Sequence, residues 1–232
     1  MSHSTGILVP CYDIRAVAFD LDGTIVPTYE RGVEDIREIA KRRGLSFNEE
    51  TIRRIKLHWG VPGAELLAIC FDISIEYAHE VYKDWTIVEH ENPLLPIRGA
   101  ASTIRSLHAR GVKCGLVTSR TRDSLTPTLG RMSFRNLFHH TAAKDETAGH
   151  KPDPKVFTCW LAFCAGHDIL PHQVAYVGDG HVDITAANEA GMISIAVETG
   201  PKHQLDSVSP HVRLSTIAKV GPWLLQQSMA LA

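Results

Sequence analysis

Short, apolar segments rich in β-branched residues alternate with helical stretches along this chain, and this alternation limits its fold more than any other feature. Helical patterns cover Ala100–Arg110 and Asp183–Ala190. Strands that alternate with helices predict a parallel sheet with helices on both faces, because each parallel connection has to cross over the sheet. We therefore predict an α/β protein. The four strand candidates are Ala16–Asp20, Lys113–Thr118, Val174–Gly178 and Ile193–Val197.

Residues 27–96 interrupt the alternation and carry helix signals instead of strand signals. The stretch is too long for a structureless loop in a compact domain. Acidic Glu34-Asp35 near the start of one segment and Lys41–Gly44 at its end match the charges and the glycine stop of a helix. Ser46-Phe47-Asn48-Glu49 has the spacing of a capping box for the next helix, and Ile75–Val88 can form another.

The sequence thus predicts a Rossmann-like core from residues 1–26 and 97–232, with a small α-helical domain, residues 27–96, inserted into it. Hydrophobic residues make up 44% of the chain, which is enough for a packed core. The net charge of −2, without a basic run, argues against a nucleic-acid or membrane-surface partner. No apolar run reaches transmembrane length and no signal peptide is recognisable, so we expect a cytoplasmic location.

Two aspartates lie at the end of the first strand candidate and just after it. Asp20 and Asp22 stand directly before Gly23 and Thr24. Like charges this close oppose folding unless a cation or a proton transfer makes use of them. Mg²⁺ is bound by one or two carboxylates together with substrate phosphate oxygens, and a free Asp can act as a nucleophile. The pair therefore indicates metal-assisted phosphoryl chemistry.

Three further motifs follow in the chain. Thr118 and Ser119 end the second strand candidate, Lys151 precedes a Pro-rich turn, and Asp179 and Asp183 follow the third. Open α/β sheets bind ligands at the carboxyl ends of their strands. We therefore expect these side chains to meet the first aspartate pair in one site.

With four motifs in this order, the chain resembles the haloacid dehalogenase superfamily, specifically its phosphatase-type members, from about Ile14 to about Gly200. The loop His58–Gly63 is similar to that of the phosphoglycolate phosphatase branch. The resemblance implies Mg²⁺-dependent hydrolysis of a small phosphorylated metabolite through an aspartyl-phosphate. It also implies that residues 27–96 are a cap that closes over the active site.

The resemblance assigns the catalytic roles. Asp20 would attack phosphorus as the nucleophile, and Asp22 would protonate the leaving oxygen and then activate the hydrolytic water. Thr118 would donate a hydrogen bond to a phosphate oxygen, and Lys151 would place a positive charge beside the phosphoryl group and Asp20. Because dehalogenating relatives lack the second aspartate, Asp22 argues against dehalogenation.

The resemblance also implies a Mg²⁺ site. Its ligands would be the carboxylates of Asp20 and Asp179 and the backbone carbonyl of Asp22. Asp183 would either reach the ion through a water molecule or orient Lys151 from outside the ligand set.

The substrate contacts are less sharply defined. Gly23 would expose backbone N–H groups to the phosphate, while Thr24 either braces that loop or is a simple turn former. Ser119 would bind through its backbone N–H or its hydroxyl. His58 and Trp59 either contact the leaving group or form a turn whose tryptophan packs inside the helical domain.

Several alternatives stay open. Arg120 and Arg122 either reach an anionic substrate or lie on the surface. A phosphomutase would share every catalytic residue, and a non-catalytic binding protein could use the same fold, although an intact set of motifs argues against the latter. Ile25–Thr28 and Arg98 depart from the phosphoglycolate phosphatase pattern, so the substrate is not specified. The sequence leaves the oligomeric state open as well.

Overall fold

A computed structural model of the chain describes residues 11–91, 93–134, 136–201 and 205–230. Its sheet has six strands, all parallel, in the order β3-β2-β1-β4-β5-β6. The α/β class and the parallel sheet are thereby confirmed. The sequence did not reveal β3 or β6, since three residues are too few to establish an alternating pattern. The strands are β1 (Ala16–Phe19), β2 (Lys113–Val117), β3 (His140–Ala142), β4 (Val174–Gly178), β5 (Ile193–Val197) and β6 (Val212–Leu214).

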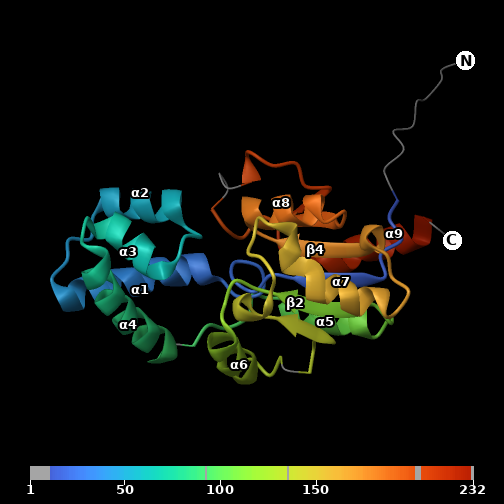
Figure 1. Ribbon diagram of the computed structural model, residues 1–232, viewed down its shortest axis with the longest axis horizontal. Coiled ribbons are helices and arrows are strands. Elements are labelled where there is room, and N and C mark those ends of the chain that lie inside the picture. The colour runs from blue at the N-terminus through green and yellow to red at the C-terminus, as the bar shows by residue number, and fades with distance from the viewer. Residues whose placement is uncertain (1–10, 92, 135, 202–204, 231–232) are drawn as a thin grey trace, which may run out of the picture.

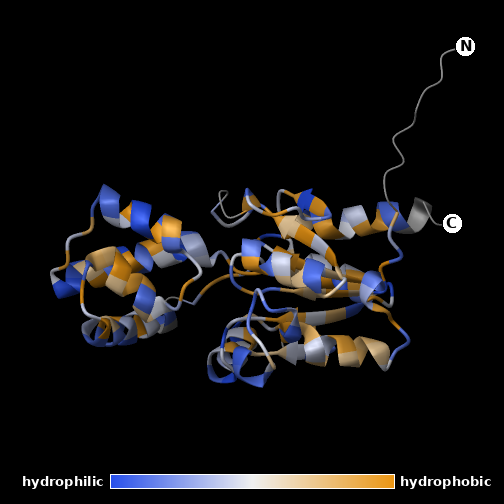
Figure 2. Ribbon diagram, turned by 45° about the horizontal axis from the view of Figure 1, so that its top comes forward, coloured by the Kyte–Doolittle hydropathy of each residue, from blue (hydrophilic) through white to orange (hydrophobic). Residues whose placement is uncertain are grey.

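Helices cover both faces of the sheet. The alternation of side chains in β1 explains why both faces are apolar: Val17 and Phe19 pack into one hydrophobic cluster with α5, α6 and α9, and Ala16 and Ala18 into another with α7 and α8. Figure 2 shows hydrophobic residues along the strands between these helices. The five helices are α5 (Ala100–His108), α6 (Arg122–Arg131), α7 (Thr158–Ala165), α8 (His181–Glu189) and α9 (Val220–Ala230).

The first four helices after β1 form a unit with a hydrophobic core of its own. Ile36, Ile39, Ile55 and Leu67 are buried in this cluster, which is separate from the two clusters at the sheet. In Figure 1 the four helices lie at the left, apart from the sheet. The exact division into domains after residues 26 and 96 stays a prediction. The helices are α1 (Thr28–Arg43), α2 (Glu49–His58), α3 (Gly63–Phe71) and α4 (Ile75–Glu91).

The ends of α1 and α2 show how far local signals determine helix boundaries. As expected, α1 ends at Gly44, which has a φ of 67° and donates its N–H to the carbonyl of Ala40. The expected capping box from Ser46 to Glu49 is wrong. Asn48 is the N-cap of α2 instead: its side chain accepts from the N–H of Thr51, whose hydroxyl accepts from the N–H of Asn48. Asn caps a helix as well as Ser does, so the later residue could take this position.

The register of the central strands places three loops side by side. Phe19, the last residue of β1, lies between Leu116 of β2 and Val177 of β4. The loops after these strands therefore emerge at the same edge of the sheet, next to the start of α1. Within the described ranges, no helix is both long enough and apolar enough to cross a membrane.

Candidate active site

A cavity of about 660 Å³ lies between the carboxyl edge of the sheet and the helical unit. Asp20, Thr118 and Asp179, from the loops after β1, β2 and β4, line it and are buried. The volume is in the usual range of small-molecule sites. The structure thus brings together side chains that are far apart in the sequence, at the edge where open α/β sheets bind ligands.

Lys151 lies at the centre of this group. Its Nζ donates to the carboxylates of Asp20 at 2.7 Å and Asp183 at 2.6 Å, and its side chain is only 4% exposed. Burial lowers the pKa of Lys151, but the charges of Asp183 and Asp20 outweigh this effect and hold the pKa well above its usual value. The lysine is therefore a fixed positive charge. The loop that carries it leads into a short 3₁₀ helix, Pro154–Phe157, whose first turn is capped by Asp153.

Three buried carboxylates surround this single cation. Asp20, Asp179 and Asp183 each offer an oxygen atom within 4.8 Å of the others. Burial raises the pKa of Asp20 to about 7, against the opposing effect of Lys151, and burial also raises the pKa of Asp179 well above its usual range. A second cation would relieve this excess of negative charge. An all-oxygen donor set of carboxylates fits a hard ion such as Mg²⁺.

Two glycines leave the space in which Asp179 lies. A Cβ at Gly23, whose φ is +77°, would come within 2.1 Å of Oδ2 of Asp179, and a Cβ at Gly200 within 2.2 Å of the same atom. Real Cβ atoms do not approach other heavy atoms this closely. The backbone at both positions can therefore approach the carboxylate only because it carries no side chain.

Asp22 points to a different partner. Arg120 holds its carboxylate in a two-pronged ion pair, with Nη2 2.8 Å from Oδ1 and Nε 2.9 Å from Oδ2. The same guanidinium contacts Glu89 of α4, with Nη1 2.8 Å from Oε1. The sequence left open whether Arg120 reaches a substrate or lies on the surface; the structure places it among the residues that line the cavity, not on an exposed surface. Arg120 links the loop after β2 to the helical unit, with 14% of its side chain exposed.

The predicted substrate residues separate into two groups. Ser119 and Trp59 line the cavity, whereas His58, Gly23 and Thr24 are not among its lining residues. Thr24 is fully buried, and its Oγ1 lies 3.5 Å from Oδ1 of Asp179. His58 ends α2, where its carbonyl accepts the N–H of Val61. The hydroxyl of Thr118, near the cavity floor, accepts the N–H of Arg120 at 3.2 Å.

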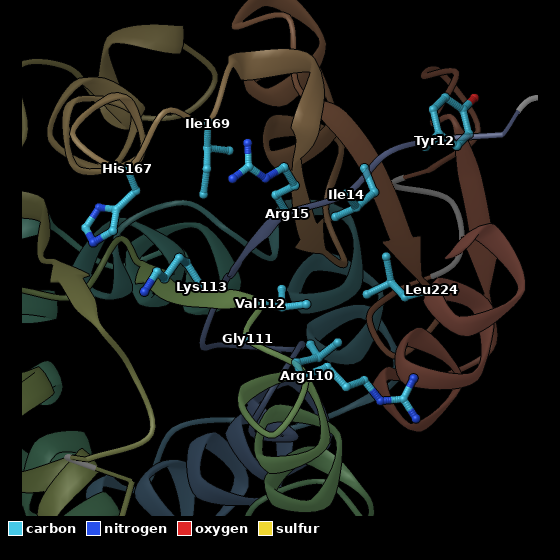
Figure 3. Close-up of a pocket in the computed structure, with 11 residues that line it drawn as sticks. Tyr12, Ile14, Arg15, Arg110, Gly111, Val112, Lys113, His167, Ile169 and Leu224 are labelled. Atoms are coloured by element: carbon cyan, nitrogen blue, oxygen red, sulfur yellow. The ribbon is translucent and has the colours of Figure 1, made fainter. Parts of the chain in front are cut away.

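A second cavity, of about 370 Å³, lies at the opposite edge of the sheet, where β1 and β2 begin. Figure 3 shows Arg15, Lys113 and His167 around one side of it and the guanidinium of Arg110 turned away from them. No Asp, Glu, Ser, Thr or Cys is among its described lining residues. It therefore lacks the carboxylates of the first cavity, and the candidate chemistry is confined to the carboxyl edge.

Comparison with known proteins supports this assignment. Residues 17–197 match the family model described as haloacid dehalogenase-like hydrolase. A phosphoglycolate phosphatase of Pseudomonas putida is 27% identical, over 90% of this chain and 79% of its own length. The chain is similar in fold to a predicted phosphoglycolate phosphatase from Haemophilus somnus, with a TM-score of 0.75, 20% identity and coverage of 90% and 96%. It is also similar to a β-phosphoglucomutase from Clostridium difficile, with a TM-score of 0.67, 20% identity and coverage of 94% and 98%.

Proposed function

The chain belongs to the haloacid dehalogenase-like hydrolases, and we propose that it is a Mg²⁺-dependent phosphatase of the cytoplasm. It would hydrolyse a small phosphate monoester through an aspartyl-phosphate on Asp20. The observation that carries this proposal is the position of Lys151, whose Nζ lies between the buried carboxylates of Asp20 and Asp183. The name of the Pseudomonas putida relative supports a phosphatase, and its low identity does not specify the substrate.

The acidic cluster is the proposed metal site. Asp20, Asp179 and Asp183 would hold Mg²⁺, together with the backbone carbonyl of Asp22 that the family resemblance implies. When bound, the ion would neutralise negative charge on the transferred phosphoryl group. It would also offset the cost of burying three carboxylates around one lysine.

The first half-reaction forms a bond between an Asp20 oxygen and phosphorus and breaks the bond from phosphorus to the leaving oxygen. Lys151 fixes one oxygen of Asp20, which leaves the other to attack. The Thr118 hydroxyl and the backbone N–H of Ser119, which both line the cavity, would donate to phosphoryl oxygens. Asp22 donates its proton to the leaving oxygen, so that an alcohol departs.

The second half-reaction reverses the proton transfer. Asp22 takes a proton from water, the water oxygen bonds to phosphorus, and the bond between Asp20 and phosphorus breaks, which releases inorganic phosphate. For both steps Asp22 has to leave Arg120, its partner in this structure. We propose that closure of the helical unit, which Arg120 contacts through Glu89, accompanies this change and excludes bulk water.

Phosphate release from a panel of sugar, organic-acid and nucleotide monophosphates tests the proposal. We expect release that requires Mg²⁺, stops with EDTA, and is abolished by Asp20→Asn. Asp206→Asn, at an exposed aspartate, is the matched control. Circular dichroism would show that both variants are folded. Metal-independent release, or undiminished turnover by Asp20→Asn, would contradict the proposal.

A further inference from the structure

Three aromatic rings line the cavity from the helical unit. Trp59 follows α2, and Tyr82 and Trp85 belong to α4. The Trp85 ring lies 6.4 Å from the Trp59 ring and 5.9 Å from the Tyr82 ring, measured between centroids. Tyr82, Trp85 and Glu89 are three and four residues apart, so they share one face of α4. The ion pair between Glu89 and Arg120 joins this face to the loop after β2.

Each ring is held in place by a neighbour. A Cβ at Gly32 would come within 2.2 Å of the Trp59 ring, and a Cβ at Gly63 within 2.2 Å of the Tyr82 ring. Neither glycine has a positive φ, so the backbone conformation does not call for glycine at these positions. The close approach of each ring does, because a Cβ would collide with it. Trp85 packs against both of these rings, and its side chain lies close to the carboxylate of Asp35, which is 2% exposed. The rings therefore form a preorganised aromatic wall, consisting of Trp59, Tyr82 and Trp85.

The charges beside the aromatic wall are largely paired. Arg31 lines the cavity and forms an ion pair with Asp35 at 2.7 Å. Arg120 forms ion pairs with Asp22 and Glu89. A carboxylate on the leaving group would have to displace Asp22 or Glu89 to reach the guanidinium of Arg120, and the Nε of Arg31 is already used by Asp35. It would also approach the charge of Glu89. The helical side of the cavity is thus better suited to an uncharged group.

The other basic residues at the cavity do not alter this conclusion. His79 is an exposed residue of α4, Lys144 begins the short 3₁₀ helix Lys144–Glu146, and His150 lies in a loop of the core. Lys151 is committed to Asp20 and Asp183. Within the described part of the chain, no lysine lines the cavity from the helical unit.

We propose that the aromatic wall binds an uncharged ring on the leaving group, so that the substrate is a phosphate ester of a ring compound rather than of a short carboxylic acid. This inference rests on the proposed phosphatase function. Aromatic side chains bind the apolar face of a ring, and stacking contributes beyond the buried area. A pyranose and an aryl group both present such a face, so either kind of ring could bind the aromatic wall. The assay below distinguishes a sugar phosphate from an aryl phosphate.

The experiment compares kcat/KM, with Mg²⁺, for four esters. Glucose 6-phosphate and phenyl phosphate carry uncharged rings, glycerol 3-phosphate is uncharged and acyclic, and 2-phosphoglycolate carries a carboxylate. We expect one ring ester to exceed both acyclic esters at least about tenfold, the effect of one strong stacking contact. The ring ester with the higher kcat/KM shows whether the wall prefers a sugar ring or an aryl ring. A higher kcat/KM for 2-phosphoglycolate than for both ring esters would overturn the inference while leaving the phosphatase intact.

Two variants test the aromatic wall itself. Trp85→Leu removes a ring face but keeps an apolar side chain, and Gly63→Ala forces the Tyr82 ring to move. Each should lower kcat/KM for the preferred ring ester about tenfold more than for glycerol 3-phosphate. Trp223→Leu, in α9, is the control and should leave this ratio at the wild-type value. Equal losses of kcat/KM on both esters would overturn the inference and leave the proposed phosphatase function intact. If the folded wild type released no phosphate from any of the four esters, both the inference and the proposed phosphatase function would be overturned.

Discussion

Replacing Lys151 by Met removes one buried positive charge and keeps a side chain of similar length. The Lys151 side chain is 4% exposed, and those of its partners Asp20 and Asp183 are 9% and 4% exposed. Removing one partner from a buried ion pair costs roughly 3–5 kcal/mol, because the remaining charge has no compensation. We expect a loss of this size in the Mg²⁺-free protein, which corresponds to a melting temperature lower by roughly 6–20 °C for a domain of this length.

The loss should depend on pH. Burial raises the pKa of Asp20 to about 7 even with the lysine present. Without Lys151 this pKa rises further, so the neutral form of Asp20 predominates at pH 5 in both proteins. At pH 8 only the wild type has a cation to offset the ionised form. The variant should therefore lose more stability at pH 8 than at pH 5.

Unfolding followed by circular dichroism in EDTA, at both pH values, measures this effect. Lys155→Met is the matched control, since Lys155 is exposed and lies four residues away in the same segment. A loss of less than about 1 kcal/mol, typical of a surface ion pair, would refute the reasoning. So would an equal loss at pH 5 and pH 8.

Two further predictions concern the metal and the link to the helical unit. Burial raises the pKa of Asp20 to about 7, and burial also raises the pKa of Asp179 above its usual range. The unfolded chain therefore releases these protons at lower pH than the folded chain, and the metal-free protein should lose stability as pH rises from about 4 to about 7. Mg²⁺ should then raise the melting temperature more at pH 8 than at pH 5.5, and Asp179→Asn should diminish that gain; an equal gain at both pH values would contradict the metal site. For the link, a double-mutant cycle with Arg120→Leu and Glu89→Gln should give a coupling of about 1 kcal/mol or more in unfolding free energy, and additive effects would show that this ion pair does not stabilise the structure.

Short-range patterns predicted the parts of this molecule that depend on neighbouring residues. The aspartates after β1, Thr118 after β2 and Asp179 after β4 each follow an apolar run that ends in a polar turn, and the parallel sheet then brings these ends together. The strand β3 could not be predicted, because three residues carry no periodic signal. The cap of α2 was misplaced since Ser46 and Asn48 are both good N-caps, and only packing decides between them.

The contacts across the cavity could not be read from the sequence. Arg120 meets Asp22 across 98 residues and Glu89 from a different structural unit. No local spacing relates these three positions. Tyr82 and Trp85 look like ordinary residues of an amphipathic helix, and Gly63 and Asp35, which lie beside their rings, belong to other helices. Long-range pairing of this kind requires the folded structure.

The central claim is that Asp20 carries the phosphoryl group, and trapping that intermediate tests it most directly. The leaving group of p-nitrophenyl phosphate departs without a proton, so Asp22→Asn can still form the aspartyl-phosphate from this ester. Its side chain can no longer take a proton from water, so the intermediate should accumulate. Acid quenching followed by peptide mass spectrometry should then find one phosphoryl group on the peptide that contains Asp20. A phosphoryl group on another residue, or none under conditions where this variant cleaves substrate, would contradict the account.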